Sequence, residues 1–231
     1  MKKSPGNYSG LLLVLCLAMN TDLFSQEETS VSPLTTGADI YSSFIWRGTK
    51  SGTGPAFQPM LEYTSGSFTA GAWGSFDFSG YQEVDLYFTL SLPAGFSVGI
   101  TDYYSPDLKY FDYSRISGSH AFELNLGFSK NNIDFYANYI LNEAGGIGSI
   151  GKDLYFQAGY SFRLFRLLIG AGNGWLTYEP DTGKSSFNIC NTGIEVNRSI
   201  KISDTFVIPV TGQLVFNPSE ERLYLVVGFT L

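Results

Sequence analysis

"EVDLYFTLSL", from Glu83 to Leu92, alternates strictly between two kinds of side chain. Its even-numbered positions are all apolar: Val84, Leu86, Phe88, Leu90 and Leu92. Its odd-numbered positions carry Glu83, Asp85, Tyr87, Thr89 and Ser91. Because neighbouring side chains of a β-strand point to opposite faces, this period of two predicts a strand with one apolar and one polar face.

The same alternation recurs along most of the chain after residue 37. We count about twelve such segments, each close to the length that a membrane-spanning β-strand needs. They lie at 38–48, 55–63, 68–77, 83–91, 96–102, 120–128, 133–141, 153–162, 167–178, 186–196, 205–216 and 221–231. Helical periodicity is not evident in any stretch. The sequence therefore predicts an all-β fold, a single transmembrane antiparallel β-barrel of about twelve strands in an up-and-down meander.

The lengths of the connections support this topology. One set is short: 64–67, 92–95, 129–132, 163–166 and 197–204. The alternate set contains the two longest connections: 49–54, 78–82, 103–119, 142–152, 179–185 and 217–220. Short periplasmic turns and longer extracellular loops are typical of outer-membrane barrels.

The sequence of a soluble β-sandwich or a lipocalin-like barrel would alternate as well. The choice of a membrane barrel over a soluble fold therefore rests on other features. Charged residues make up 15% of the chain, against about 25% in average soluble domains. The lysines after residue 26 all fall in predicted loops or at strand ends. Aromatic residues near the strand ends resemble the two interfacial girdles of membrane barrels. The girdle candidates are Trp46, Tyr63, Phe76, Phe128, Phe162, Trp175 and Phe229.

Residues 1–26 have the features of a secretory signal peptide, which leaves residues 27–231 as the barrel domain. Lys2 and Lys3 precede the apolar run "LLLVLCLAM" (11–19), and "FSQ" (24–26) is a plausible cleavage region. That run is too short for a membrane-spanning helix, which needs about 20 residues. We expect export to the outer membrane of a Gram-negative bacterium. Cys190 would then be the one cysteine left, so no internal disulfide is expected.

The stretch "SSFIWRGTKSGTGP" (42–55) places Trp46 beside Arg47. In a strand these two side chains point to opposite faces. We expect Trp46 to lie in the outer aromatic belt, facing lipid, and Arg47 to point into the lumen. A lipid-facing arginine at mid-depth would cost about 2–4 kcal/mol, which would enforce this register.

Several of these stretches resemble the N-terminal half of the TorF-type porin family. They are "SSFIWRGT" (42–49), "GPAFQPMLEY" (54–63), "AGAWGSFDF" (70–78), "EVDLYF" (83–88) and "GITDYYSP" (99–106), with "HAFELNLGFS" (120–129) as a looser match. The resemblance covers residues 37–106 best. It implies an outer-membrane β-barrel with a porin-like role and supplies no substrate. One departure from outer-membrane habit is Leu231 at the C-terminal position, where phenylalanine is usual.

The predicted register points a set of charged side chains into the lumen. The pore-lining candidates are Arg47, Asp77, Glu83, Asp85, Glu123, Asp134, Asp153, Arg163 and Arg222. Acids outnumber bases among them, and acidic linings favour cations. The predicted function is therefore passive diffusion of small hydrophilic solutes, with a mild preference for cations. The alternative is a barrel plugged by arginine–acid pairs, with a structural or surface-binding role through extracellular loops such as 103–119.

Other classes of function find little support. The net charge of −7 argues against nucleic-acid binding, which needs a basic surface. The loop "GIGSIGKD" (146–153) has phosphate-loop glycine spacing but carries Asp153 where Ser or Thr is required, and no helix follows. His120 is the single histidine, so neither a catalytic triad nor a metal-ligand cluster is visible. We expect no enzyme activity and no cofactor; the expected partners are outer-membrane lipid and small hydrophilic solutes. The solute and the oligomeric state stay open.

Overall fold

The computed structural model describes residues 32–179 and 184–231. The predicted signal peptide, residues 1–26, lies outside the described residues. Residues Ser32–Leu231 form one compact unit; the predicted boundary of the barrel domain at residue 27 stays a prediction.

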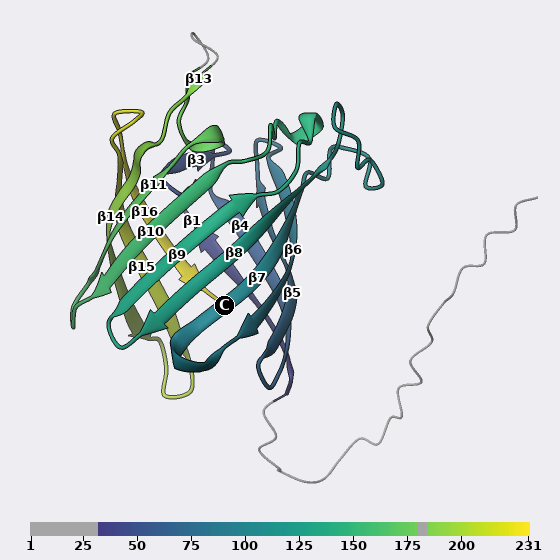
Figure 1. Cartoon of the computed structure of the whole chain (residues 1–231). Helices are drawn as coiled ribbons and strands as arrows, with labels where there is room; N and C mark the ends of the chain where they lie inside the picture. The colour runs from purple at the N-terminus through teal and green to yellow at the C-terminus, as the bar shows by residue number, and fades with distance from the viewer. Residues whose placement is uncertain (1–31, 180–183) are drawn as a thin grey trace, which may run out of the picture. The chain divides into compact units, whose positions relative to one another are not determined.

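Twelve antiparallel strands of this unit form a closed barrel (Figure 1). They are β1 (Leu34–Tyr41), β4 (Ala56–Ser65), β5 (Phe68–Asp77), β6 (Gln82–Ser91), β7 (Phe96–Tyr104), β8 (His120–Lys130), β9 (Ile133–Ile140), β10 (Leu154–Ser161), β11 (Arg166–Gly172), β14 (Asn188–Lys201), β15 (Val207–Asn217) and β16 (Arg222–Thr230). Each strand pairs with the next along the ring, and β1 closes the ring by pairing with both β4 and β16. The predicted all-β meander barrel is confirmed.

The two ends of the barrel differ as predicted. At one end the connections are short: 66–67, 92–95, 131–132, 162–165 and 202–206. At the other end they are 42–55, 78–81, 105–119, 141–153, 173–187 and 218–221. This long-loop end also carries the 3-10 turns η2 (Gly145–Ile147) and η3 (Gly174–Leu176) and the short strands β12 (Tyr178–Glu179) and β13 (Lys184–Ser185). A further 3-10 turn, η1 (Pro93–Gly95), lies at the short-turn end. Among the described residues, no helix is long and apolar enough to cross a membrane.

The first loop contains a hairpin that is separate from the barrel sheet. Its strands are β2 (Phe44–Trp46) and β3 (Thr49–Ser51), which pair with each other and, among the described residues, with no other strand. Between them Arg47 (φ 52°) and Gly48 (φ 90°) both have positive φ, the conformation of a type I′ turn. The predicted wall strand over 38–48 is therefore wrong beyond Tyr41. The chain leaves the barrel sheet there, enters the separate hairpin, and reverses direction at Arg47.

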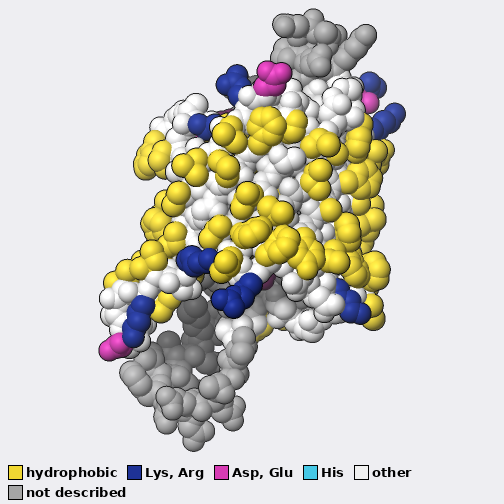
Figure 2. Space-filling view, turned by 90° about the vertical axis from the view of Figure 1, so that its left-hand side faces the viewer, with side chains coloured by type: hydrophobic (Ala, Val, Ile, Leu, Met, Phe, Trp, Pro, Cys, Tyr) yellow, Lys and Arg dark blue, Asp and Glu magenta, His cyan; other side chains and the backbone are white. Residues whose placement is uncertain are grey.

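The wall of the barrel is apolar outside and polar inside. Large exposed side chains on its outer face include Leu86, Ile100, Leu126, Phe135, Ile169 and Leu214. Buried polar side chains lie on the inner face, among them Asp85 next to Leu86, Asp134 next to Phe135, and Asn138. Figure 2 shows hydrophobic side chains spread over the wall, with lysines and arginines near its two ends.

Aromatic rings pair on the outer face near the short-turn end. The ring centroids of Phe96 and Phe128 are 4.9 Å apart, and those of Phe162 and Phe165 are 4.8 Å apart. Tyr63 and Phe68 make a similar pair at 6.5 Å. At the long-loop end of the wall Phe76 lies opposite Phe57, whereas Phe229, near the far end of β16, lies opposite Ile40 and Val210. The membrane-girdle role of these rings stays a prediction.

Candidate functional site

The hairpin β2–β3 lies inside the barrel. The wall residues that it contacts come from five strands around the ring: Trp73 of β5, Tyr103 of β7, Glu123 of β8, Tyr155 of β10 and Asn217 of β15. A segment that touches so many sides of a closed ring can lie only within it. Figure 1 shows β3 among the upper ends of the strands, at the long-loop end.

Arg47, at the tip of the hairpin, forms a bidentate ion pair with Glu123. The Nη1–Oε2 distance is 2.6 Å and the Nη2–Oε1 distance is 2.7 Å. The Glu123 side chain is 1% exposed and also accepts hydrogen bonds from Tyr103 Oη (3.0 Å) and Asn125 Nδ2 (2.7 Å). The structure places Arg47 inside the barrel, at the tip of a hairpin rather than on a wall strand as the sequence predicted. Charge-assisted bidentate pairs are among the strongest polar contacts, so this pair is the main polar anchor of the hairpin.

Gly48 fits the tip of the hairpin against the wall. A Cβ atom at this position would collide with the carbonyl oxygen of Cys190 on β14. Gly48 O also accepts a hydrogen bond from Asn217 Nδ2 (3.2 Å). Glycine at position 48 therefore serves both the turn and the close approach of the two backbones.

Trp46 and Trp175 are placed differently from the predicted lipid-facing girdle. Trp46 packs against the buried cluster of Tyr155, Leu176 and Cys190 inside the barrel. Its ring centroid is 6.1 Å from that of Trp175. Trp175 belongs to η3 in a loop, where its Nε1 donates to the carbonyl of Gly148 at 2.8 Å. The difference arises because both residues belong to connections that fold over or into the lumen, so strand parity does not decide which way they face.

Glu83 and Asp85 face the lumen from β6, as the alternation predicts. Glu83 accepts a hydrogen bond from Tyr81 Oη at 2.5 Å. Asp85 is 7% exposed, and within the described part of the chain its Oδ1 has no hydrogen-bond partner. A buried carboxylate without a full set of partners is costly. Among the described residues, neither Glu83 nor Asp85 forms an ion pair with a lysine or an arginine.

A second ion pair lies nearer the short-turn end of the lumen. Arg166 of β11 contacts Asp134 of β9, with Nη2–Oδ2 2.6 Å and Nε–Oδ1 3.2 Å. The sequence suggested Arg163 as the inward base, but Arg163 lies exposed in the turn between β10 and β11. Arg166 was missed because the predicted turn covered it, whereas β11 already begins there.

Three other predicted pore-lining residues lie at the long-loop end. Asp77 accepts hydrogen bonds from the backbone N–H groups of Thr53 (2.8 Å) and Tyr81 (2.9 Å), so it joins two loops. Asp153 accepts the backbone N–H of Trp175 at 3.1 Å. Arg222 is exposed at the first position of β16. Whether any of the candidate residues lines a conducting pore stays a prediction.

The hairpin divides the lumen into two spaces. Trp46, Thr49 and Ser51 line a cavity of about 490 Å³ at the mouth. Ile45, Arg47 and Gly48 line a smaller cavity of about 170 Å³ on the other side, together with wall residues of β10, β11, β14 and β15. The two faces of the hairpin thus belong to different cavities, and the hairpin acts as a partition between them.

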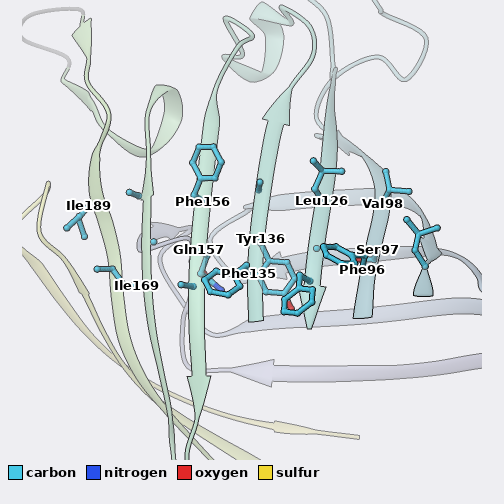
Figure 3. Close-up of a pocket in the computed structure, with 17 residues that line it drawn as sticks. Phe96, Ser97, Val98, Leu126, Phe135, Tyr136, Phe156, Gln157, Ile169 and Ile189 are labelled. Atoms are coloured by element: carbon cyan, nitrogen blue, oxygen red, sulfur yellow. The ribbon is translucent and has the colours of Figure 1, made fainter. Parts of the chain in front are cut away.

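Figure 3 shows a different hollow, on the wall of the barrel. It has a volume of about 660 Å³ and lies over β7 to β11 and β14. Apolar side chains dominate its lining, among them Val98, Leu126, Phe156 and Ile169. A hollow of this composition on an apolar outer face suits a hydrocarbon chain rather than a hydrophilic solute.

An Asp–His pair lies on the outer face of the wall. Asp102 and His120 continue the exposed apolar sides of β7 and β8, and His120 Nδ1 is 2.9 Å from both carboxylate oxygens of Asp102. His120 Nε2 contacts the carbonyl oxygen of Tyr110. The ring is therefore held from both nitrogens, between the carboxyl group of Asp102 and the carbonyl of Tyr110. Tyr113 stacks on the ring with centroids 4.6 Å apart.

This pair fixes the loop 105–119 against the outside of the barrel. His120 is 1% exposed, because the loop covers it. The loop also has internal hydrogen bonds: Ser114 and Ser117 donate to Asp112 and lower the pKa of its carboxyl. The sequence offered a signal for the pair, since Asp102 and His120 interrupt the apolar faces of two adjacent predicted strands.

His120→Phe is expected to release the loop. The substitution keeps the stacked ring but removes both hydrogen bonds. Losing such bonds while a charged partner stays buried costs about 1.5–3 kcal/mol. Cleavage by trypsin at Lys109 and Arg115 should then accelerate roughly tenfold or more. Tyr113→Phe is the matched control, because it keeps its ring on His120. Equal cleavage rates for wild type and His120→Phe would show that the pair does not hold the loop.

In residues 32–179 and 184–231, no group of three or more His, Cys, Asp or Glu side chains is placed to hold a metal ion. Cys190 is free and buried against Tyr155 and Leu176, and burial is typical of an unreactive thiol. Gly146 to Asp153 form a surface loop around η2, with no helix N-terminus of the kind that binds phosphate.

Comparisons with known proteins give a limited result. No protein-family model and no curated protein matches the chain, so the resemblance to TorF-type porins stays an expectation. Among solved structures, the chain is similar to one described as the crystal structure of Acinetobacter baumannii OccAB3, with a TM-score of 0.40 and 10% sequence identity. The match covers 88% of this chain and 66% of that chain. A likeness at this level does not transfer that protein's properties to this one.

Proposed function

We propose that this protein is a gated outer-membrane channel for small hydrophilic solutes, and that the hairpin Phe44–Ser51 is its gate. The observation that carries the proposal is the independence of the hairpin. It forms a sheet of its own inside a closed barrel, and side chains such as Arg47 and Asn217 attach it to the wall. It can therefore leave the lumen without breaking the strand pairing of the barrel.

The membrane location is supported by the faces of the wall. Large apolar side chains are exposed all around the barrel, and a closed barrel satisfies its backbone hydrogen bonds internally, which lipid demands. Residues 1–26 would direct the chain to export and be removed on the way. The outer membrane of a Gram-negative bacterium is the site that fits both features.

The proposed preference for cations rests on the lumenal charges. On the inner face of the wall strands the described acids are Asp39, Glu62, Asp77, Glu83, Asp85, Glu123, Asp134 and Glu195. The described bases in the lumen are Arg47 and Arg166, and each is already paired with an acid. The remaining carboxylates would attract cations into the passage.

Glu83→Gln combined with Asp85→Asn is expected to reduce the cation preference of the open channel. Both carboxylates face the lumen, and neither is paired with an arginine. The reversal potential under a salt gradient should move toward zero in the double variant. Asp204→Asn is the control, because Asp204 is exposed in the turn 202–206. An unchanged reversal potential in an open, folded double variant would count against this assignment.

Single-channel recording of the refolded protein in a planar bilayer under a salt gradient tests the proposal. Discrete conductance steps with a cation-directed reversal potential are expected, along with long closed intervals while the hairpin occupies the lumen. Heat-modifiable migration on a gel establishes that the barrel is folded. A folded barrel that never conducts, even when the hairpin is deleted, would refute the channel.

The second candidate is a permanently plugged barrel with a structural or surface-binding role. The close fit of Gly48 against Cys190 and the bidentate Arg47–Glu123 pair favour it. The two candidates differ in one observable property. A plugged barrel conducts only after the hairpin is removed, whereas a gated channel also opens spontaneously in the wild type.

A further inference from the structure

The cavity at the mouth of the barrel has the size and position of a ligand site. Its volume is about 490 Å³, within the range of about 300–1,000 Å³ usual for small-molecule pockets. It is lined from the hairpin, the β5–β6 connection, the end of β7 and the loop that follows it, the loop around η2, and η3. A solute arriving from the long-loop side would meet this cavity before reaching the partition formed by the hairpin.

Aromatic rings form much of its wall. The ring-bearing residues of the lining are Trp46, Tyr81, Tyr103, Tyr104 and Trp175. Trp46 meets Tyr103 edge-on at 5.7 Å between centroids and lies 6.1 Å from Trp175. The hairpin and two loops are thus required to bring these rings together, and their packing against one another holds them in place.

The charge of the lining has one sign. Glu83 and Asp107 contribute carboxylates, and the described residues of the lining include no lysine, arginine or histidine. Arg47 lines the cavity on the other side of the hairpin, where it is bound to Glu123 and its guanidinium lies over one face of the Trp46 ring at 4.6 Å, which leaves the other face of that ring for a ligand. The mouth cavity is therefore aromatic and electronegative, which disfavours an anionic ligand.

We propose that this cavity binds a small organic cation of the ammonium class, such as a quaternary ammonium group. Aromatic faces attract such cations by about 0.5–2 kcal/mol each, and carboxylates add to the attraction. The cation would lie among the rings of Trp46, Tyr103 and Trp175, with Glu83 and Asp107 as counter-charges. The site is complete with the hairpin in the lumen, so the proposal holds whether or not the channel opens.

Binding is measured on the refolded full barrel in detergent, by tryptophan fluorescence and by titration calorimetry. Two of the three tryptophans of the chain line the cavity, so an occupant should change the fluorescence directly. The probe is choline chloride, and we expect a saturable change with a dissociation constant on the order of 1 mM. The neutral isostere 3,3-dimethylbutan-1-ol should bind at least roughly tenfold more weakly, because it lacks the charge.

Glu83→Gln should weaken choline binding roughly fivefold, as expected for the loss of one partly exposed charge. Asp204→Asn should leave it unchanged. The comparison of choline with its neutral isostere uses only the wild type, so the test stands even if a variant misfolds. No saturable binding of choline, or equal binding of the isostere or of glucose, would overturn the proposal. Because the assay measures no current, its failure is separate from a failure of the channel.

Discussion

Deletion of Phe44–Thr53 is expected to convert the barrel into a continuously open channel. The deletion leaves Ser42, Ser43, Gly54 and Pro55 between β1 and β4. Tyr41 and Ala56 face each other in the β1–β4 ladder, so a four-residue loop can join them. With the partition gone, closed intervals should disappear from single-channel traces in planar bilayers.

Two further variants make the deletion informative. Removing the hairpin leaves Glu123 buried without Arg47, so the deletion is also made with Glu123→Gln to remove that charge. Shortening the loop within residues 109–119 is the control, because this part of the loop covers His120 on the outer face of the wall and its loss should leave closed intervals intact. A folded deletion variant that stays silent would mean that wall side chains, rather than the hairpin, fill the lumen.

Glu123→Gln alone should have the largest effect of any single substitution on the closed state. It leaves the guanidinium of Arg47 buried without an anion, and breaking a buried ion pair in this way costs about 3–5 kcal/mol. A change of about 3 kcal/mol in the hairpin equilibrium corresponds to a roughly hundredfold shift toward the open state. The measurement is the open probability at fixed voltage and salt.

Asp134→Asn is the matched control for that substitution. It breaks the other lumenal ion pair, in which Arg166 lies 2.6 Å from Asp134, but both partners belong to wall strands and neither touches the hairpin. We expect it to lower the resistance of the barrel to denaturant while leaving the open probability near the wild-type value. Equal open probabilities for Asp134→Asn and Glu123→Gln would sink the idea that the Arg47 pair holds the gate.

The wall of the barrel is predictable from the sequence because one rule governs it. Wherever a strand separates an apolar outside from a polar lumen, the sequence must alternate, as it does from Glu83 to Ser91. The same rule cannot recognise the hairpin. The sequence from Phe44 to Trp46 is strand-like, and these residues do form the strand β2. What distinguishes β2 from a wall strand is that wall side chains surround it, and the local sequence does not encode this.

The misplaced residues have a common physical origin. Trp46 and Trp175 lie in connections between wall strands. There the direction of a side chain is set by tertiary contacts rather than by the alternation of residues along a strand. Arg166 was read as part of a turn because the start of a strand is locally weak information. The Asp102–His120 pair, in contrast, could have been predicted: two polar residues on the apolar faces of adjacent strands must find partners, and each is the nearest candidate for the other.

The seam where β1 pairs with β16 constrains the order in which the barrel folds. Thr230 donates to Asp39 across a separation of 191 residues, and the ladder between these two strands has three residue pairs, extended by backbone hydrogen bonds at Ala38 and Ser42. Loop-closure entropy makes contacts between such distant parts of a chain the slowest to form. The pairing of β1 with β16 should therefore form late in folding, after the intervening strands have paired with one another. The hairpin follows directly from β1, so the complete ring of wall side chains surrounds it only after that last pairing has formed, and an assembly factor that held the seam apart would delay both steps.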